Sequence, residues 1–201
     1  MRSIRFLFGL ASLLLLVGCA GVGIVATSDP LQKLNDANDL YQRQDRPLPA
    51  EQLIQQAMTI YQERNDPQGL GHAHREYADL LRSRAITGKW QNHYRTNGFL
   101  DKTVTFDNRL AKASEHYSKA LEYYVRAETK LREEARFDAL TNVYMNMAYS
   151  SSQLQDRERA CALYSRALDA YAENLRRNPG AKPYGAVSQI VESEKKRLNC
   201  A

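Results

Sequence analysis

The chain has 201 residues, a formal net charge of +5, 43% apolar residues and twelve tyrosines against one tryptophan. This length suffices for one domain with a sizeable core, and a charge excess so slight and evenly spread argues against nucleic acid as a partner. With only six prolines and ten glycines, the composition favours an ordered, mostly helical protein.

The N-terminus has the parts of a bacterial export signal. Arg2 and Arg5 give a basic start, and the apolar run that follows ends at Val17. This run is too short to span a bilayer on its own. It leads into Leu-Val-Gly-Cys, ending at Cys19, which resembles the lipobox of bacterial lipoproteins. The alternatives are an ordinary secretory signal or an uncleaved anchor next to a chance cysteine.

The lipobox resemblance implies how the chain is processed and where it resides. Residues 1–18 would be removed as a signal peptide, and Cys19 would carry the lipid that anchors the protein to a membrane. Residues 19–28 would then tether the lipid to a domain formed by residues 29–201. The residue after the cysteine is Ala20 and not aspartate. In lipoproteins of bacteria with two membranes, this favours the outer membrane, facing the periplasm.

Two helical pairs are predicted to begin with the same signal. Asp29-Pro30 and Asp66-Pro67 each place a capping aspartate before a proline at the first helical position. The first signal predicts a helix that stops near Arg46-Pro47, followed by a partner helix after Pro49. The second predicts a helix over residues 67–84. Inward-facing residues at helical spacing are Leu31, Leu34, Ala37, Leu40 and Tyr41 in the first helix and Ala50, Ile54 and Ala57 in the second.

The partner of the helix over residues 67–84 is displaced along the chain. Ala113, Tyr117 and Ala120 predict it, but they come later than an uninterrupted repeat would place them. We therefore expect an insertion at residues 86–108, which holds the only tryptophan. Within it, the Asn97-Gly98 turn signal predicts a hairpin or an extended loop. The aromatic rings of the insertion either contact a partner or fold back onto the helices.

The clearest repeat covers residues 144–167. Apolar residues recur at helical spacing in two blocks, and the polar segment between them has the length of a tight turn. The blocks are Tyr144, Met147 and Ala148, then Ala160, Tyr164 and Ala167. This arrangement of alanines and rings resembles the tetratricopeptide repeat (TPR). A last amphipathic helix after Pro183, carrying Val187, Ile190, Val191 and Leu198, is predicted to cap the stack.

The TPR resemblance implies an all-α, right-handed helical-repeat stack of about seven helices with a C-terminal capping helix. The first helix of each pair in such a stack lines a groove that binds peptides. The groove residues would be Asn35, Asp39, His72, Arg75, Asp79, Arg82, Asn142, Met145, Asn146 and Tyr149. The alternative for this strip is an ordinary solvated helix surface.

No pattern for catalysis or metal binding is found in the sequence. His72 and His74 are two residues apart on a predicted helix, so they point in nearly opposite directions and do not share an ion. A nucleophile–base arrangement, a glycine-rich phosphate loop and an HExxH motif are all missing from the sequence. We therefore expect no enzymatic activity, no cofactor and no metal.

Two cysteines remain once Cys19 is assigned to the lipid. Cys161 and Cys200 form an even pair in an oxidising compartment. Antiparallel packing of the last two helices would bring the start of one beside the end of the other, where these cysteines lie. We predict a disulfide, and the alternative is two separate thiols.

The expected function is that of a lipid-anchored envelope adaptor that binds another protein or peptide through the TPR groove. The alternative is a structural subunit of an envelope complex that uses its convex face and the insertion at residues 86–108. An envelope enzyme is a third class, without a site in the sequence to support it.

Overall fold

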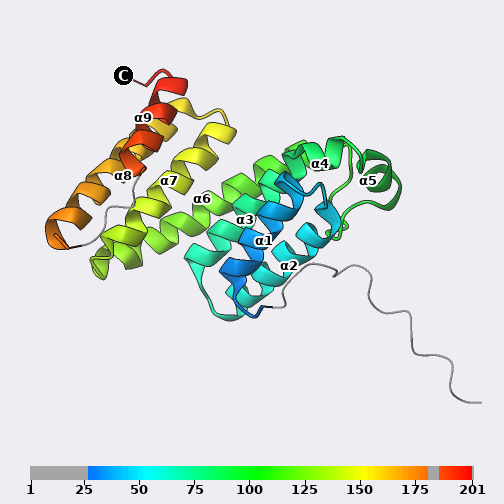
Figure 1. The fold of residues 1–201 in the computed structure, drawn as a ribbon, viewed down its shortest axis with the longest axis horizontal. Helices are drawn as coiled ribbons and strands as arrows, with labels where there is room; N and C mark the ends of the chain where they lie inside the picture. Colours follow the sequence, from blue (N-terminus) through cyan, green and yellow to red (C-terminus); the bar gives the residue numbers. More distant parts are fainter. Residues whose placement is uncertain (1–26, 181–185, 201) are drawn as a thin grey trace, which may run out of the picture.

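A computed structural model describes residues 27–180 and 186–200. Within these ranges the protein is an all-α helical-repeat stack, as the sequence predicts (Figure 1). Its helices, in chain order, are α1 (Pro30–Gln42), α2 (Pro47–Glu63), α3 (Pro67–Arg82), α4 (Arg84–Thr87), α5 (Gln91–Asn97), α6 (Arg109–Glu133), α7 (Phe137–Gln153), α8 (Arg157–Arg177) and α9 (Val187–Arg197).

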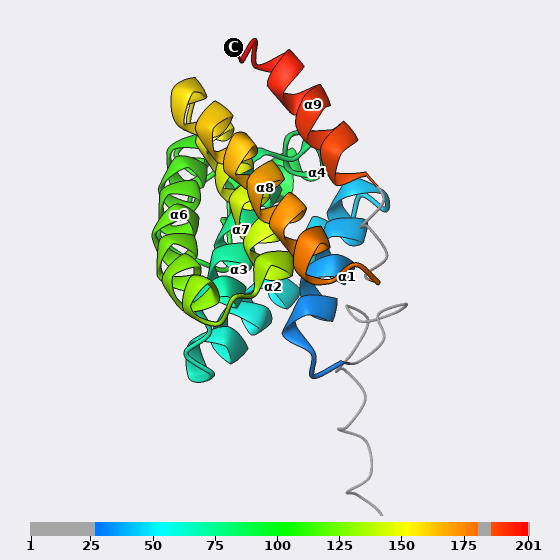
Figure 2. The same ribbon diagram turned by 90° about the vertical axis from the view of Figure 1, so that its left-hand side faces the viewer.

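The long helices pack as three neighbouring pairs, α1 with α2, α3 with α6, and α7 with α8 (Figure 1, Figure 2). The first helices of the pairs also contact one another, because α3 packs against both α1 and α7. The last helix, α9, packs against α8. Figure 1 shows α4 and α5 at one end of the long axis and α8 with α9 at the other.

Two of the helices, α1 and α3, start where local sequence signals predict. Asp29 accepts a hydrogen bond from the Leu31 amide at 3.0 Å, and Asp66 accepts one from the Gly69 amide at 3.0 Å. In both cases a proline opens the helix, where its missing N–H costs nothing.

Three of the connections between long helices share one turn geometry. Asn65, Ala135 and Gln155 follow α2, α6 and α7 with positive φ angles of 48°, 52° and 64°. In each turn, the next amide donates to a carbonyl five residues earlier, as in a Schellman motif. The repetition of one turn at corresponding places is what a stack of similar helical pairs requires.

Alanines and aromatic rings fill the core between the helices. Ala160 and Ala167 are fully buried, and Tyr164 between them is 2% exposed. Where α2 crosses α3, the ring of Tyr61 lies so close that a Cβ on Gly69 would be 2.0 Å from its Cδ1 atom. The small residues therefore set how closely the helices approach, and the rings occupy the remaining volume.

Several predicted helix boundaries and two residues predicted to face inward differ from the structure. Leu31, expected to face inward on the first helix, is 50% exposed. The first helix ends at Gln42 and the third at Arg82, each earlier than predicted. The second helix begins at Pro47 and not after Pro49, because proline is well accommodated at the first helical position. The capping helix starts at Val187, and its predicted start at Pro183 lies outside the described residues. Ile190, expected to face inward on this helix, is 46% exposed, so Val187 and Val191 alone are its buried residues.

The region of the insertion forms the two short helices α4 and α5 and a compact loop instead of the predicted hairpin or extended loop. Asn97-Gly98 ends α5, where Gly98 has a φ of 68° that suits glycine. The rings of Tyr94 and Phe99 are 1% exposed and stack with centroids 4.4 Å apart. Trp90 is partly buried, and its Nε1 atom donates to the carbonyl of Asp45 at 2.7 Å. These rings fold back onto the helices.

The predicted signal peptide (1–18), Cys19 and most of the tether (19–28) lie outside the described residues. The first described helix, α1, begins at Pro30. Among the described helices, none is both long and apolar enough to cross a membrane.

Candidate functional site: the surface strip of α1, α3 and α7

All the predicted groove residues lie on the first helices of the three pairs, which contact one another in sequence order. We call this surface the α1/α3/α7 strip. Its residues differ in exposure. Asn35, Arg82 and Asn142 are exposed, Asp39, His72, Arg75, Met145, Asn146 and Tyr149 are half-buried, and Asp79 is buried.

The centre of the strip is a polar network around Arg75. The Arg75 guanidinium donates to Asp79 Oδ2 at 2.7 Å and to Glu76 Oε2 at 2.9 Å. The side chain of Arg75 is 22% exposed, whereas both carboxylates are nearly buried. Its two terminal nitrogens are therefore occupied within the chain.

Glu76 joins α1 to α3. Its Oε1 atom accepts hydrogen bonds from Asn38 Nδ2 and from the Tyr41 hydroxyl, both at 2.7 Å. Because Glu76 is 3% exposed, these donors and Arg75 replace the water that the carboxylate loses on burial. Asn38 thus forms a polar link between the first and second helical pairs.

Asp79 joins α3 to α6 and α7. Its Oδ1 atom accepts from the Tyr117 hydroxyl at 2.5 Å and from the Tyr149 hydroxyl at 2.8 Å. Burial raises the pKa of Asp79, while the Arg75 cation and the two hydroxyl donors oppose that rise. Burial likewise raises the pKa of both tyrosines. The strip is thereby cross-linked by hydrogen bonds from α1 through α3 to α7.

A second network joins the last two pairs. Glu128 on α6 accepts from the Tyr144 hydroxyl of α7 at 2.9 Å and from Arg132 at 2.9 Å. Arg166 of α8 also pairs with this carboxylate, and its guanidinium lies over the Tyr144 ring, 4.3 Å from the centroid. These contacts hold the pKa of Glu128 below its ordinary value, although burial opposes them.

The histidines have separate partners. His72 Nδ1 hydrogen-bonds the Tyr124 hydroxyl at 2.9 Å, and its pKa is lowered to about 4 by burial and by Arg75. The Nδ1 atoms of His74 and His116 lie 2.9 Å apart. Burial lowers the pKa of these two histidines to about 3 and about 4, so both are neutral and one donates to the other. In the described residues no three His, Cys, Asp or Glu side chains are grouped to hold a metal.

Glu51, which belongs to no motif in the sequence, fastens the insertion to the first helical pair. This α2 side chain is 1% exposed, and its Oε1 atom accepts from the Leu100 amide at 2.7 Å and from the Tyr77 hydroxyl at 3.1 Å. Burial raises the pKa of Glu51 to about 7, against the effect of these donors and of Lys102. A helix-interior glutamate gives no local sign that its partner lies in a distant loop.

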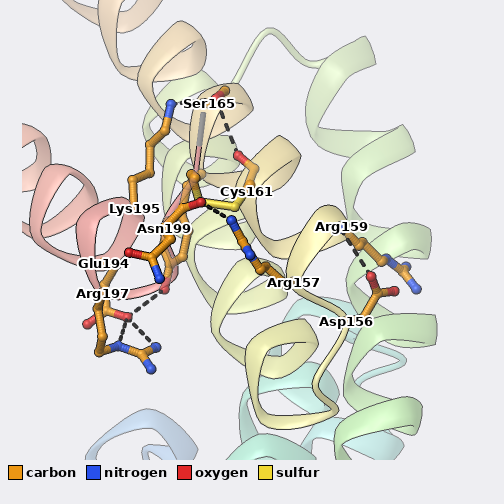
Figure 3. Close-up of a disulfide and its surroundings, with 11 residues drawn as sticks. Asp156, Arg157, Arg159, Cys161, Ser165, Glu194, Lys195, Arg197 and Asn199 are labelled. Carbon is orange, nitrogen blue, oxygen red and sulfur yellow. Dashed lines mark hydrogen bonds and ion pairs between the residues drawn. A yellow bond between two sulfur atoms is a disulfide. The ribbon is translucent and has the colours of Figure 1, made fainter.

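Cys161 and Cys200 are joined by a disulfide, with Cα atoms 5.6 Å apart (Figure 3). The bond links Cys161, near the start of α8, to Cys200, which follows the end of α9. Nearby, Lys195 Nζ donates to Ser165 Oγ at 3.1 Å, and Arg157 donates to the Asn199 carbonyl. This arrangement fastens the last helix to the end of the stack.

The geometry therefore combines a hydrogen-bonded strip along one set of helices, an insertion packed at one end and a covalently held helix at the other. No protein-family model, no curated protein and no solved structure matches this chain.

Proposed function

We propose that this protein is a lipid-anchored envelope adaptor with a TPR-like domain, which binds another protein or a peptide through the α1/α3/α7 strip. The observation that carries the proposal is the network across the strip. Hydrogen bonds from Asn38 to Glu76 and from Tyr149 to Asp79 connect three helices that are distant in sequence. A surface fixed in this way loses little conformational freedom on binding.

Exposed polar groups flank this fixed centre. Asn35, Asn142 and Arg82 are exposed on the strip, and their donors and acceptors suit hydrogen bonds to a peptide backbone. The central network contains two carboxylates and one guanidinium, so with both acids ionised it adds one negative charge. Such a strip favours a polar or cationic partner segment over one ending in a free carboxylate.

The proposed lipid anchor and the proposed cellular location both depend on the resemblance of the segment ending at Cys19 to a lipobox. The described fold begins at α1, only about ten residues beyond that cysteine. A short tether would hold the domain close to the membrane surface. Several acyl chains, with about 0.8 kcal/mol for each buried CH₂ group, would make this attachment stable. We propose the outer membrane, facing the periplasm, as the location.

Site-specific crosslinking tests the binding surface. A photo-crosslinking amino acid placed at Asn142 should form a discrete adduct in intact cells. The same amino acid at Glu122, which is exposed on α6, is the matched control and should form no such adduct. Asn35→Arg combined with Asn142→Arg should remove the partner while helicity is retained. These positions are preferable to Arg75 because reversing the charge of Arg75 would place three acidic groups together in the strip.

One observation favours the alternative, a structural subunit that uses its convex face and the insertion. Leu100 within the insertion and Leu110 just after it are 47% and 50% exposed. Leu100→Asp with Leu110→Asp should leave the crosslink at Asn142 intact if the strip binds the partner. Loss of the partner in this variant, with the Asn35/Asn142 variant unaffected, would support the structural role instead.

A further inference from the structure

The C-terminal helix α9 has few non-covalent contacts with the rest of the fold. Val187 and Val191 are its buried side chains. Glu194 receives a hydrogen bond from the Tyr164 hydroxyl at 3.5 Å, and Lys195 donates to Ser165. By contrast, α7 and α8 pack along their whole lengths. The disulfide is therefore a large part of what holds α9 in place.

The disulfide itself is reachable from solvent. Both cysteines are half-buried, and they line a cavity of about 540 Å³ at the surface between α8 and α9. Arg157 and Lys195 line the same cavity, together with Glu158. Figure 3 shows the Arg157 and Lys195 side chains on either side of the sulfur atoms. Two cations against one carboxylate make this opening favourable for an approaching thiolate.

We propose that the Cys161–Cys200 bond is a thiol-exchange site, which a dithiol reduces in the folded protein, and that its reduction releases α9 from the stack. The inference goes beyond the adaptor function and does not depend on it. The ligand class is a dithiol, either a small molecule or a pair of cysteines in a reducing protein.

The exchange is balanced without any further reactant. One thiolate of the dithiol attacks a sulfur of the bond, forming a mixed disulfide and expelling the other cysteine as a thiolate. The second thiol of the reductant then attacks the mixed disulfide and becomes part of the reductant's own disulfide. Two electrons and two protons pass to Cys161 and Cys200, which end as thiols. Arg157 and Lys195 stabilise the thiolates formed on the way.

Release of α9 changes the surface at the end of the stack. Tyr164 is 2% exposed, and its hydroxyl contacts Glu194 of α9. Once the helix detaches, the α8 surface covered by Val187 and Val191 meets solvent. The redox state of one bond would thus decide whether an apolar surface is covered or exposed at this end of the protein.

Reduction kinetics and hydrogen exchange test the proposal on the full mature chain. Dithiothreitol should reduce the bond at least about tenfold faster than the oxidised protein unfolds globally, and low denaturant should not change the rate. After reduction, α9 amides should exchange at least about tenfold faster, while those of α3 and α6 stay protected. Reduction that occurs only at the rate of global unfolding, or an α9 that stays protected once reduced, would overturn the proposal.

Two sets of variants serve as controls. Cys161→Ser with Cys200→Ser should show the fast exchange of α9 without reductant, and reductant should then have no effect. Lys195→Gln should slow reduction by glutathione by about threefold, whereas Lys196→Gln, on the exposed side of α9, should leave it unchanged. Equal rates for the two lysine variants would contradict the role of the cavity's positive charge.

Discussion

The buried carboxyl of Glu51 should make the stability of this protein depend on pH in a direction opposite to that of a salt-bridged acid. Its pKa is raised from 4.5 to about 7, mainly because burial removes water from the charged form. The folded protein therefore keeps this proton at pH values where the unfolded chain has released it. The stabilising contribution of Glu51 is fully present below pH 4.5 and falls until the pH passes about 7. The total loss is about 3 kcal/mol, since one pKa unit corresponds to about 1.4 kcal/mol.

Glu51→Gln removes the charge and keeps an oxygen to accept from the Leu100 amide and the Tyr77 hydroxyl. The other groups facing Glu51 are Asp101 and Lys102, whose effects on its pKa oppose each other. Near pH 8 the variant should exceed the wild type in free energy of unfolding by up to about 3 kcal/mol. Near pH 5 the two proteins should agree to within about 1 kcal/mol.

Guanidinium unfolding at several pH values measures this difference. The matched control is Glu63→Gln, since Glu63 is exposed at the end of the same helix, and it should unfold like the wild type across the range. The reasoning would be refuted by a Glu51→Gln variant that keeps the wild-type pH dependence or is less stable near pH 8. In either case the carboxylate would be better hydrated or better paired than its burial implies.

Three further predictions concern packing and processing. Gly69→Ala should lower the free energy of unfolding by about 1–3 kcal/mol, because its Cβ would lie 2.0 Å from the Tyr61 ring, whereas Gly180→Ala, with open space around it, should leave Tm unchanged. Tyr164→Ala removes a ring that is 2% exposed and should cost about 3–5 kcal/mol in denaturant unfolding, and an unchanged midpoint would place the ring outside the core. Cys19→Ser should leave an unprocessed precursor that takes up no labelled palmitate, and normal cleavage with labelling would rule out the lipobox.

The helices were predictable where the sequence carries local signals. An aspartate before a proline marks the starts of α1 and α3, and both aspartates accept the capping hydrogen bonds expected of them. The helix ends were harder, because Ala135 and Gln155 adopt the left-handed geometry at which glycine is usual. In the insertion, Asn97-Gly98 marks the end of α5. The same pair of residues is also typical of a hairpin turn, so the sequence alone does not distinguish a helix end from a hairpin.

The polar contacts of the strip were not predictable from the sequence. Its residues follow from helical spacing, but the pairing of Arg75 with Glu76 and Asp79 depends on which side chains are buried once the helices pack. The same holds for His74 and His116, which lie 42 residues apart, and for Glu51, whose amide donor is 49 residues away. Such contacts are products of tertiary packing, which local patterns do not encode.

The anchoring of the insertion has a consequence for folding cooperativity. Helical-repeat stacks generally unfold as nearest-neighbour arrays, with each unit stabilised only by those beside it. Here the hydrogen bonds from Trp90 to Asp45 and from Leu100 to Glu51 connect the insertion of the second pair to the turn and helix of the first. The first two pairs should therefore open together as one cooperative unit. The third pair is joined to the second through the Tyr149–Asp79 and Tyr144–Glu128 hydrogen bonds, and none of these contacts joins it to the insertion, so it should open as a separate unit only when these bonds are lost.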